Sequence, residues 1–143
     1  MKSKKQWGYK MEFYVEGRPR AREFVESLLP SMLEQLKLTR SRKFLHIILD
    51  PSIEELGTTL PLNGLDMYLV VLKPTRDLLA LGATLAHELT HVAQFAKGTL
   101  QVTPRGKRWR GKFYGLKTPY LEQPWEVQAF SKQEIVMRRA IEV

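Results

Sequence analysis

The stretch TLAHELTHVAQ, residues 84–94, decides the fold of this chain. It lies inside a longer segment, from Thr75 to Gly98, that is apolar at most of its positions. Thr75 is a favourable N-cap and Gly98 a favourable end, so the pattern predicts a helix of about 22 residues. Because a helix that is apolar on nearly every side is normally buried, we expect it at the centre of the domain.

Three residues of this helix have the spacing of a metal site. His87 and His91 are four residues apart, so in a helix their imidazoles lie on one face and can share a zinc ion, with bonds of about 2.0 to 2.1 Å. Glu88 lies beside them, where its carboxylate can act as the general base for a metal-activated water. The alternative is a helix with two imidazoles and a glutamate at its surface. The uncharged residues around the motif argue against this alternative, because they predict a buried helix. Burying two histidines and a glutamate without partners costs on the order of several kcal/mol.

A third ligand is expected, because catalytic zinc sites usually have three protein ligands and one open position. The chain has no cysteine, which excludes thiolates and disulfides, and its remaining histidine, His46, is interpreted as a core or sheet-face residue. A carboxylate is therefore expected. Glu126 is the best candidate, since it lies beside Trp125 at the start of the last predicted helix; otherwise it is simply a favourable charge at a helix N-terminus. Glu122 and Glu134 remain alternatives.

The segments HELTH, residues 87–91, and PWEVQA, residues 124–129, together resemble the small gluzincin-type metallopeptidases, or minigluzincins, and related SprT-like peptidases encoded by phages or bacteria. The resemblance covers roughly residues 84–130. It implies that His87, His91 and Glu126 hold one zinc ion, and that Glu88 is the general base of a peptidase. It also implies a compact α+β domain, in which a small sheet packs on the metal helix.

Two features depart from the patterns of known zinc peptidases. The segment between His91 and Glu126 is longer than in thermolysin-like enzymes, so we expect this loop to fold back over the site. Unlike Spartan-type proteins, the chain has no third histidine of the expected kind and no cysteine-bound structural zinc. A role in nucleic-acid repair is therefore not carried over.

The first half of the chain predicts one helix and two strands. Apolar residues recur at helical spacing from Pro19 to about Leu38, and Pro30 within this segment predicts a kink or two shorter helices. Phe44–Leu49 and Met67–Leu72 are short apolar runs typical of strands. The segment between them, with Gly57, Pro61 and Asn63-Gly64, predicts a loop or hairpin connection. We place Met67–Leu72 near the sheet edge, where an extended peptide could bind through its backbone.

The second half predicts a long loop and a final helix. Gly98 to Thr118 is expected to form a loop containing a β-hairpin, and Glu122 to Ile141 a C-terminal helix with Pro124 in its first turn. With 143 residues, 43% of them hydrophobic, the chain can fill one core. We therefore predict one zinc-peptidase-like domain over residues 1–143.

The segment between Val92 and Leu121 is the most polarised part of the chain. It has seven basic residues and no acidic one: Lys97, Arg105, Lys107, Arg108, Arg110, Lys112 and Lys117. One interpretation is a positive wall beside the cleft that contacts nucleic acid or an acidic protein, through Arg105, Lys107, Arg108, Arg110 and Lys112. The other is a hairpin whose aromatic residues, Trp109, Phe113 and Tyr114, pack on the core while its charges are solvated. Tyr114 and Tyr120 are candidates for donating a hydrogen bond to the tetrahedral intermediate.

Three functions follow from these patterns. The first is a zinc endopeptidase that acts on a protein or peptide. The second is a non-catalytic, zinc-stabilised protein whose basic surface binds an anionic partner, as the net charge of +8 suggests. The third, an amidase or other zinc hydrolase acting on a smaller substrate, is favoured by no feature of the sequence. Met1–Lys10 is basic but has no apolar run after it, and no membrane span is expected, so the sequence predicts a cytoplasmic protein.

Overall fold

The central helix expected from the sequence is α2, Leu78–Ala96, in the computed structural model, which describes residues 11–142. Its positions from 81 to 94 are almost all buried. The basic segment Met1–Lys10, for which the sequence predicts no signal peptide, lies outside the described residues. The expectation of a buried central helix is confirmed.

The two ends of α2 show how local chemistry sets its length. Asp77, and not Thr75 as predicted, is the N-cap: its carboxylate accepts hydrogen bonds from the backbone N–H groups of Leu79, at 3.0 Å, and Ala80, at 3.3 Å. At the other end Gly98 has a φ of +75°, a left-handed conformation that glycine adopts without strain. The helix is therefore 19 residues long, slightly shorter than predicted.

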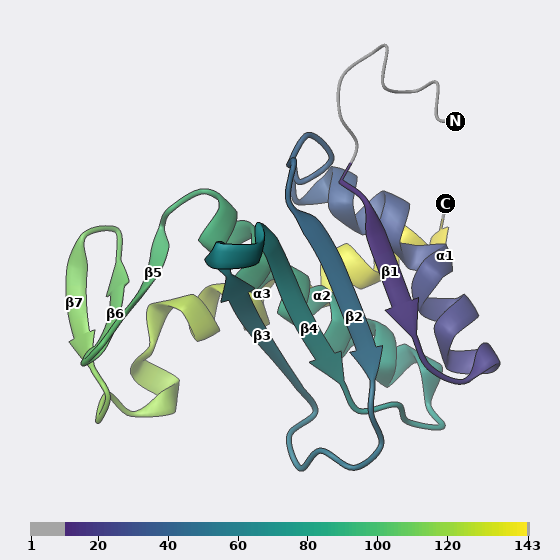
Figure 1. Cartoon of the computed structure of the whole chain (residues 1–143). Helices are drawn as coiled ribbons and strands as arrows, with labels where there is room; N and C mark the ends of the chain where they lie inside the picture. Colours follow the sequence, from purple (N-terminus) through teal and green to yellow (C-terminus); the bar gives the residue numbers. More distant parts are fainter. Residues whose placement is uncertain (1–10, 143) are drawn as a thin grey trace.

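A four-stranded sheet lies against the helices. Its strands are β1 (Phe13–Glu16), β2 (Phe44–Leu49), β3 (Gly57–Leu62) and β4 (Met67–Leu72), in the order β1-β2-β4-β3. The first three in this order are parallel, and β3 is antiparallel to β4. All three helices cover one face of this sheet (Figure 1), so alternate side chains of β2 and β4 point into the core.

The edge strand of the sheet beside the central helix is β3, and Met67–Leu72, which the sequence places near the edge, is the strand next to it. That strand, β4, pairs with β2 on one side and with β3 on the other. The sequence predicted a connection here because β3 contains Gly57 and Pro61. An edge strand tolerates proline, since one of its sides needs no partner for a backbone N–H. After β3, the short 3₁₀ helix η2, Asn63–Leu65, leads into β4.

The N-terminal helix, α1, runs without interruption over Pro19–Gln35. Pro30 does not divide this segment into two shorter helices, and it lies on the exposed side of the helix. There the carbonyl of Glu26, which loses its helical partner, can face water. Val25, Leu29 and the residues that follow them at helical spacing point into the core.

The C-terminal helix, α3, spans Pro124–Glu142 and packs along α2. Gly82 permits this approach: a Cβ atom at that position would lie 3.2 Å from Met137 of α3 and 3.4 Å from Leu28 of α1. A larger residue there would push the three helices apart. None of the described helices is long and apolar enough to cross a membrane.

The segment expected to be a loop with a hairpin forms a second, three-stranded antiparallel sheet: β5 (Leu100–Thr103), β6 (Gly106–Trp109) and β7 (Lys112–Gly115). It lies to one side of the larger sheet (Figure 1). Leu100 and Trp109 bury a small apolar cluster with Trp125 at the start of α3. The basic segment is thereby held beside the first turn of α3, within a compact α+β domain of the predicted class.

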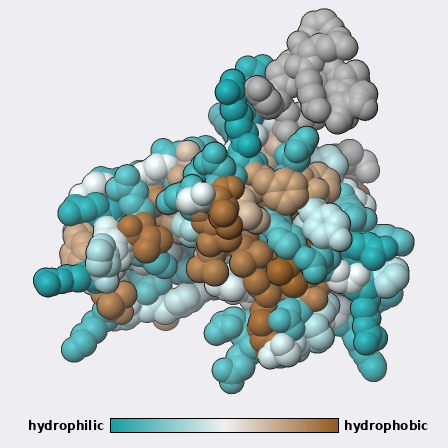
Figure 2. Space-filling view, in the orientation of Figure 1, coloured by the Kyte–Doolittle hydropathy of each residue, from teal (hydrophilic) through white to brown (hydrophobic). Residues whose placement is uncertain are grey.

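Among residues 11–142, no α-helix covers the outward face of the four-stranded sheet. Figure 2 shows apolar side chains over β3 and β4. Leu60 of β3 is exposed and pairs across the strands with Leu69 of β4. His46 also lies on this face, where its Nε2 is 2.7 Å from a carboxylate oxygen of Glu16 on β1. The interpretation of His46 as a sheet-face histidine is therefore confirmed.

Candidate metal centre

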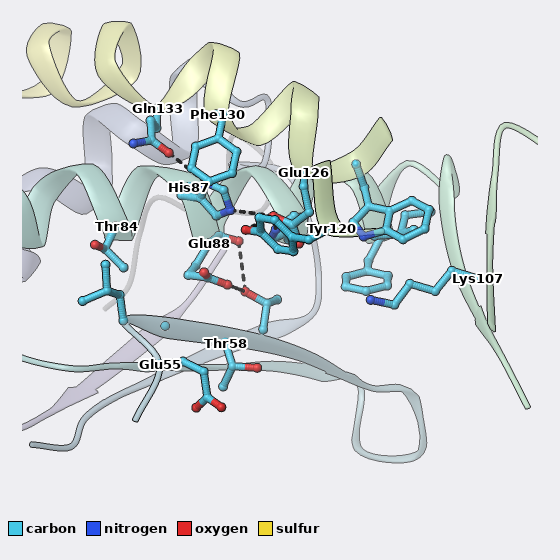
Figure 3. A pocket seen from close by; sticks show the side chains of 17 residues that line it. Glu55, Thr58, Thr84, His87, Glu88, Lys107, Tyr120, Glu126, Phe130 and Gln133 are labelled. Carbon is cyan, nitrogen blue, oxygen red and sulfur yellow. Dashed lines mark hydrogen bonds and ion pairs between the residues drawn. The ribbon is translucent and has the colours of Figure 1, made fainter. Parts of the chain in front are cut away.

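Two turns of α2 and the first turn of α3 bring the three predicted ligands together (Figure 3). The Nε2 atoms of His87 and His91 lie 2.9 and 3.2 Å from the same oxygen, Oε1 of Glu126. One possible ligand atom from each of these three residues falls within 4.8 Å of the others. Donor atoms around a tetrahedral zinc ion are about 3.3 Å apart when the bonds are about 2.0 to 2.1 Å. The spacing therefore fits one such ion.

The other residues considered as ligands lie elsewhere. The side chain of Glu126 is only 14% exposed, so it is not a solvated charge at a helix end. Glu122 is exposed in the 3₁₀ helix η3, Tyr120–Glu122. Glu134 is exposed on α3 and lies 3.5 Å from Arg138. Among the three carboxylates considered, Glu126 is the one that approaches the histidines.

The tautomer of His91 follows from its neighbour Gln94. The amide nitrogen of Gln94 donates to the backbone carbonyl of Trp125 at 3.0 Å, and this carbonyl can only accept. The amide oxygen of Gln94 must then face His91, and it lies 2.8 Å from Nδ1. His91 therefore carries a proton on Nδ1, and in the neutral ring Nε2 presents a lone pair toward Glu126.

His87 is held in the same manner from α3. Its Nδ1 lies 2.8 Å from the amide oxygen of Gln133, and Phe130 packs edge-on against its ring at 4.6 Å. Both imidazoles thus have an oxygen at each nitrogen, whereas a neutral imidazole has a single N–H. A second proton or a bound cation must satisfy the Nε2 atoms. Acceptors behind both Nδ1 atoms are the usual support of histidines that bind metals.

The electrostatics of the metal-free group favour a positive charge between these side chains. Burial lowers the pKa of His87, but the hydrogen bonds with Glu126 and Gln133 and the nearby carboxylates outweigh it and raise that pKa. Burial raises the pKa of Glu126, yet hydrogen bonds from the two imidazoles and from Tyr120 bring it well below its usual range. Glu126 is therefore a carboxylate at neutral pH, as a ligand must be.

Glu88, the predicted general base, points toward β3 from the adjacent position on α2 (Figure 3). It is 6% exposed, and its Oε1 accepts a hydrogen bond of 2.6 Å from the hydroxyl of Thr59. Gly57 leaves room for it, since a Cβ there would lie 3.0 Å from Cγ of Glu88. Burial raises the pKa of Glu88, against the hydrogen bond with Thr59 and the charges of the imidazoles, and a raised pKa suits a proton acceptor.

The two tyrosines considered as hydrogen-bond donors are placed differently. The hydroxyl of Tyr120 donates to Oε1 of Glu126 at 3.0 Å and lies in the cavity. Burial, followed by the charge of Glu126, raises the pKa of Tyr120 to about 12, so this hydroxyl keeps its proton at neutral pH. Tyr114 instead packs edge-on against Trp125 at 5.6 Å and is not among the residues that line the cavity.

Three supporting residues were not predicted from the sequence. Gln94 follows His91 by three positions, and Gln133 follows Glu126 by seven, so helical spacing places Gln94 on the face of His91 and Gln133 on the face of Glu126, from which it reaches His87. This spacing could have identified both. Thr59 had no comparable signal, because its contact with Glu88 depends on how β3 is placed against α2.

The basic segment contributes one residue to this cavity. Lys107 of β6 lines it, whereas Arg105, Arg108, Arg110 and Lys112 do not. Arg110 lies over the ring of Trp109 and Lys112 over the ring of Tyr114, at 5.4 and 5.3 Å from the ring centres. The seven charges are therefore not equivalent, and one of them faces the metal centre.

The arrangement as a whole is a concave site of about 400 Å³, bounded by α2, α3, β3 and β6. It combines a group of ligands suited to a divalent cation, a buried carboxylate beside it and a tyrosine hydroxyl. These are the parts that metal-assisted hydrolysis requires. Comparisons with known proteins give no match, whether with family models, curated proteins or solved structures.

Proposed function

We propose that the chain is a zinc-dependent peptidase of the small gluzincin or SprT-like type, with His87, His91 and Glu126 as zinc ligands and Glu88 as general base. The observation that supports it most is the approach of both imidazoles to one oxygen of Glu126, in the cavity that also holds Glu88. Zinc, when bound, supplies a Lewis acid that polarises the scissile carbonyl and acidifies water.

The chain's own residues supply the proton transfers. Glu88 accepts a proton from the attacking water and passes it to the nitrogen of the leaving amine. Thr59 orients this carboxylate through its hydrogen bond of 2.6 Å. Tyr120, which donates to Glu126 in the absence of substrate, is placed to donate instead to the oxygen that becomes negative. Gln94 and Gln133 keep the imidazoles oriented.

A peptide is the substrate that suits the edge strand. β3 forms the edge of the four-stranded sheet, and its residues Gly57, Thr58 and Thr59 line the cavity. An extended chain can add to such an edge through backbone hydrogen bonds, and this would lay its peptide bonds across the cavity. We also propose, from the sequence, that the protein is cytoplasmic.

The test separates metal binding from hydrolysis. Purified protein is expected to bind about one zinc ion per chain, as measured by metal analysis, and to cleave an unstructured protein such as casein. The substitution Glu88→Gln keeps the zinc and lowers the rate on the order of a hundredfold or more, because the proton acceptor is lost. Glu134→Gln, the same change on the exposed side of α3, leaves both properties unchanged. Protein that takes up no zinc refutes the proposal.

The binding protein predicted as the alternative rests on a different set of residues. Arg105, Arg108 and Arg110 are exposed and do not line the cavity, so they are available to an anionic partner. Binding of nucleic acid by these residues would weaken steeply with salt and would be lost in Arg108→Glu combined with Arg110→Glu. It would also survive Glu88→Gln, which distinguishes this function from hydrolysis.

A further inference from the structure

Lys107 occupies a distinct position among the basic residues of the chain. In β6 it pairs with Val102 of β5 and with Tyr114 of β7. Side chains alternate along a strand, so Lys107 points toward the metal centre while the next residue, Arg108, points to the opposite face of the sheet. The former lines the cavity, and the latter is exposed.

The ammonium group of Lys107 is positioned by an aromatic ring. Its Nζ lies 5.2 Å from the ring centre of Trp125, whose side chain is buried and follows directly on Pro124 at the start of α3. Contact with a ring face attracts a cation but does not neutralise it. No ion pair of Lys107 occurs among the described residues. Its charge is therefore available to a ligand in the cavity.

Lys107 places a positive charge on one side of the cavity. Figure 3 shows Lys107 on the side of Glu126 and Tyr120 that is away from His87, whereas Glu55 is exposed and lies apart from these side chains, below β3. A peptide that crosses the metal centre thus meets a positive charge on one side of the scissile bond. A negative group on the substrate is favoured on that side.

We propose that Lys107 makes this site selective for peptides that carry a carboxylate on one side of the scissile bond. This inference rests on the proposed peptidase function and names its substrate class. The carboxylate is either an Asp or Glu side chain or the C-terminus of the peptide, since both offer the same acceptor. A charge-assisted hydrogen bond from the ammonium group supplies the preference.

The first experiment measures binding without hydrolysis. Zinc-loaded Glu88→Gln protein is titrated with fluorescent peptides that differ by one Asp-to-Asn exchange, each prepared with a free and with an amidated C-terminus. We expect the carboxylate to tighten binding about tenfold, on one side of the central peptide bond only. A gain that follows the Asp identifies a side-chain carboxylate, and a gain that follows the free end identifies the C-terminus.

Matched variants test whether Lys107 is the cause. In the Glu88→Gln background, Lys107→Gln should remove the preference, Lys107→Arg should restore it, and Arg108→Gln should leave it intact. The last change removes the same charge from the neighbouring position on the opposite face. Circular dichroism verifies that the variants are folded. Equal binding of acidic and neutral peptides, no binding at all, or an equal loss in Arg108→Gln overturns the inference.

Hydrolysis by the unsubstituted protein is measured separately. Cleavage without a preference for the carboxylate contradicts the role of Lys107 and leaves the peptidase in place. Binding that depends on Lys107, without any cleavage, contradicts the peptidase and leaves the carboxylate site in place. The two failures are therefore distinguishable.

Discussion

Two regions of the molecule pair a histidine with a glutamate at nearly the same distance. On the open face of the sheet, His46 and Glu16 are 2.7 Å apart, and between α2 and α3 His87 and Glu126 are 2.9 Å apart. The side chains of the first pair are 24% and 48% exposed, and those of the second 10% and 14%. The distance between histidine and glutamate therefore does not indicate function. Any functional difference between the two pairs must come from the residues around them.

The two regions differ in the hydrogen-bond partners of their imidazole nitrogens. Among the described residues, His46 has a hydrogen-bond partner at Nε2 only, so one proton suffices for it. His87 and His91 have oxygens at both nitrogens and share one carboxylate oxygen, which also accepts from Tyr120. Water can serve the exposed pair, whereas the buried group needs a second proton or a cation between its rings and Glu126.

The strongest test exchanges the carboxylate in each region for an amide. Glu126→Gln is expected to lower the affinity for zinc on the order of a hundredfold or more, because a negatively charged ligand is lost. Glu16→Gln is the matched control and should leave the affinity unchanged. Isothermal titration with a competing chelator measures both. An unchanged affinity in Glu126→Gln would make the two regions equivalent and remove the basis for a metal site.

Zinc should also raise the stability of the domain, and this effect should depend on the buried group and not on the exposed pair. At a free zinc concentration 100 times Kd, linkage gives about 2.7 kcal/mol of added stability, if the unfolded chain does not bind the metal. For a domain of this size the melting temperature, Tm, should rise by roughly 5 to 10 °C and fall again with a chelator. Glu16→Gln should keep this response, and Glu126→Gln should lose it. Differential scanning calorimetry decides, and an equal rise in both variants would indicate nonspecific binding.

The sequence was sufficient for the parts of the site that depend on one helix. His87, Glu88 and His91 were predicted because a spacing of four residues has one geometric meaning in a helix. Glu126 was chosen among three carboxylates. Its apolar neighbour Trp125 favoured this choice, because an apolar neighbour predicts that the glutamate is partly buried. In the structure Glu126 meets both histidines between α2 and α3, which is the proximity that the prediction requires.

What the sequence did not predict depends on contacts between elements. The Thr59 hydroxyl reaches Glu88 only because β3 lies at the sheet edge, and Pro61 made that strand resemble a connection. The N-cap of α2 was assigned to Thr75 instead of Asp77, because both residue types are good caps and the choice depends on where the preceding chain arrives. No local pattern contains this information.

A smaller effect tests the support behind His87. Gln133→Met keeps the length of the side chain but removes the oxygen that faces Nδ1. Losing such a partner typically lowers the affinity for a metal about tenfold to a hundredfold, while the fold is retained. Gln101→Met, on an exposed position of β5, is the matched control. If both variants bind zinc equally well, the oxygen at Nδ1 does not orient His87.

The smallest effect is expected from breaking the exposed pair. His46→Gln removes the imidazole that contacts Glu16, and solvent screening limits what such a partly exposed contact contributes to roughly 0.5 kcal/mol of the free energy of unfolding. Urea denaturation should therefore show a small shift of the midpoint, and zinc affinity should equal that of the unsubstituted protein. A large loss of zinc affinity would mean that the sheet face and the metal centre are coupled. Since His46 lies on the face of the sheet that the helices do not cover, the structure offers no contact through which this coupling would act.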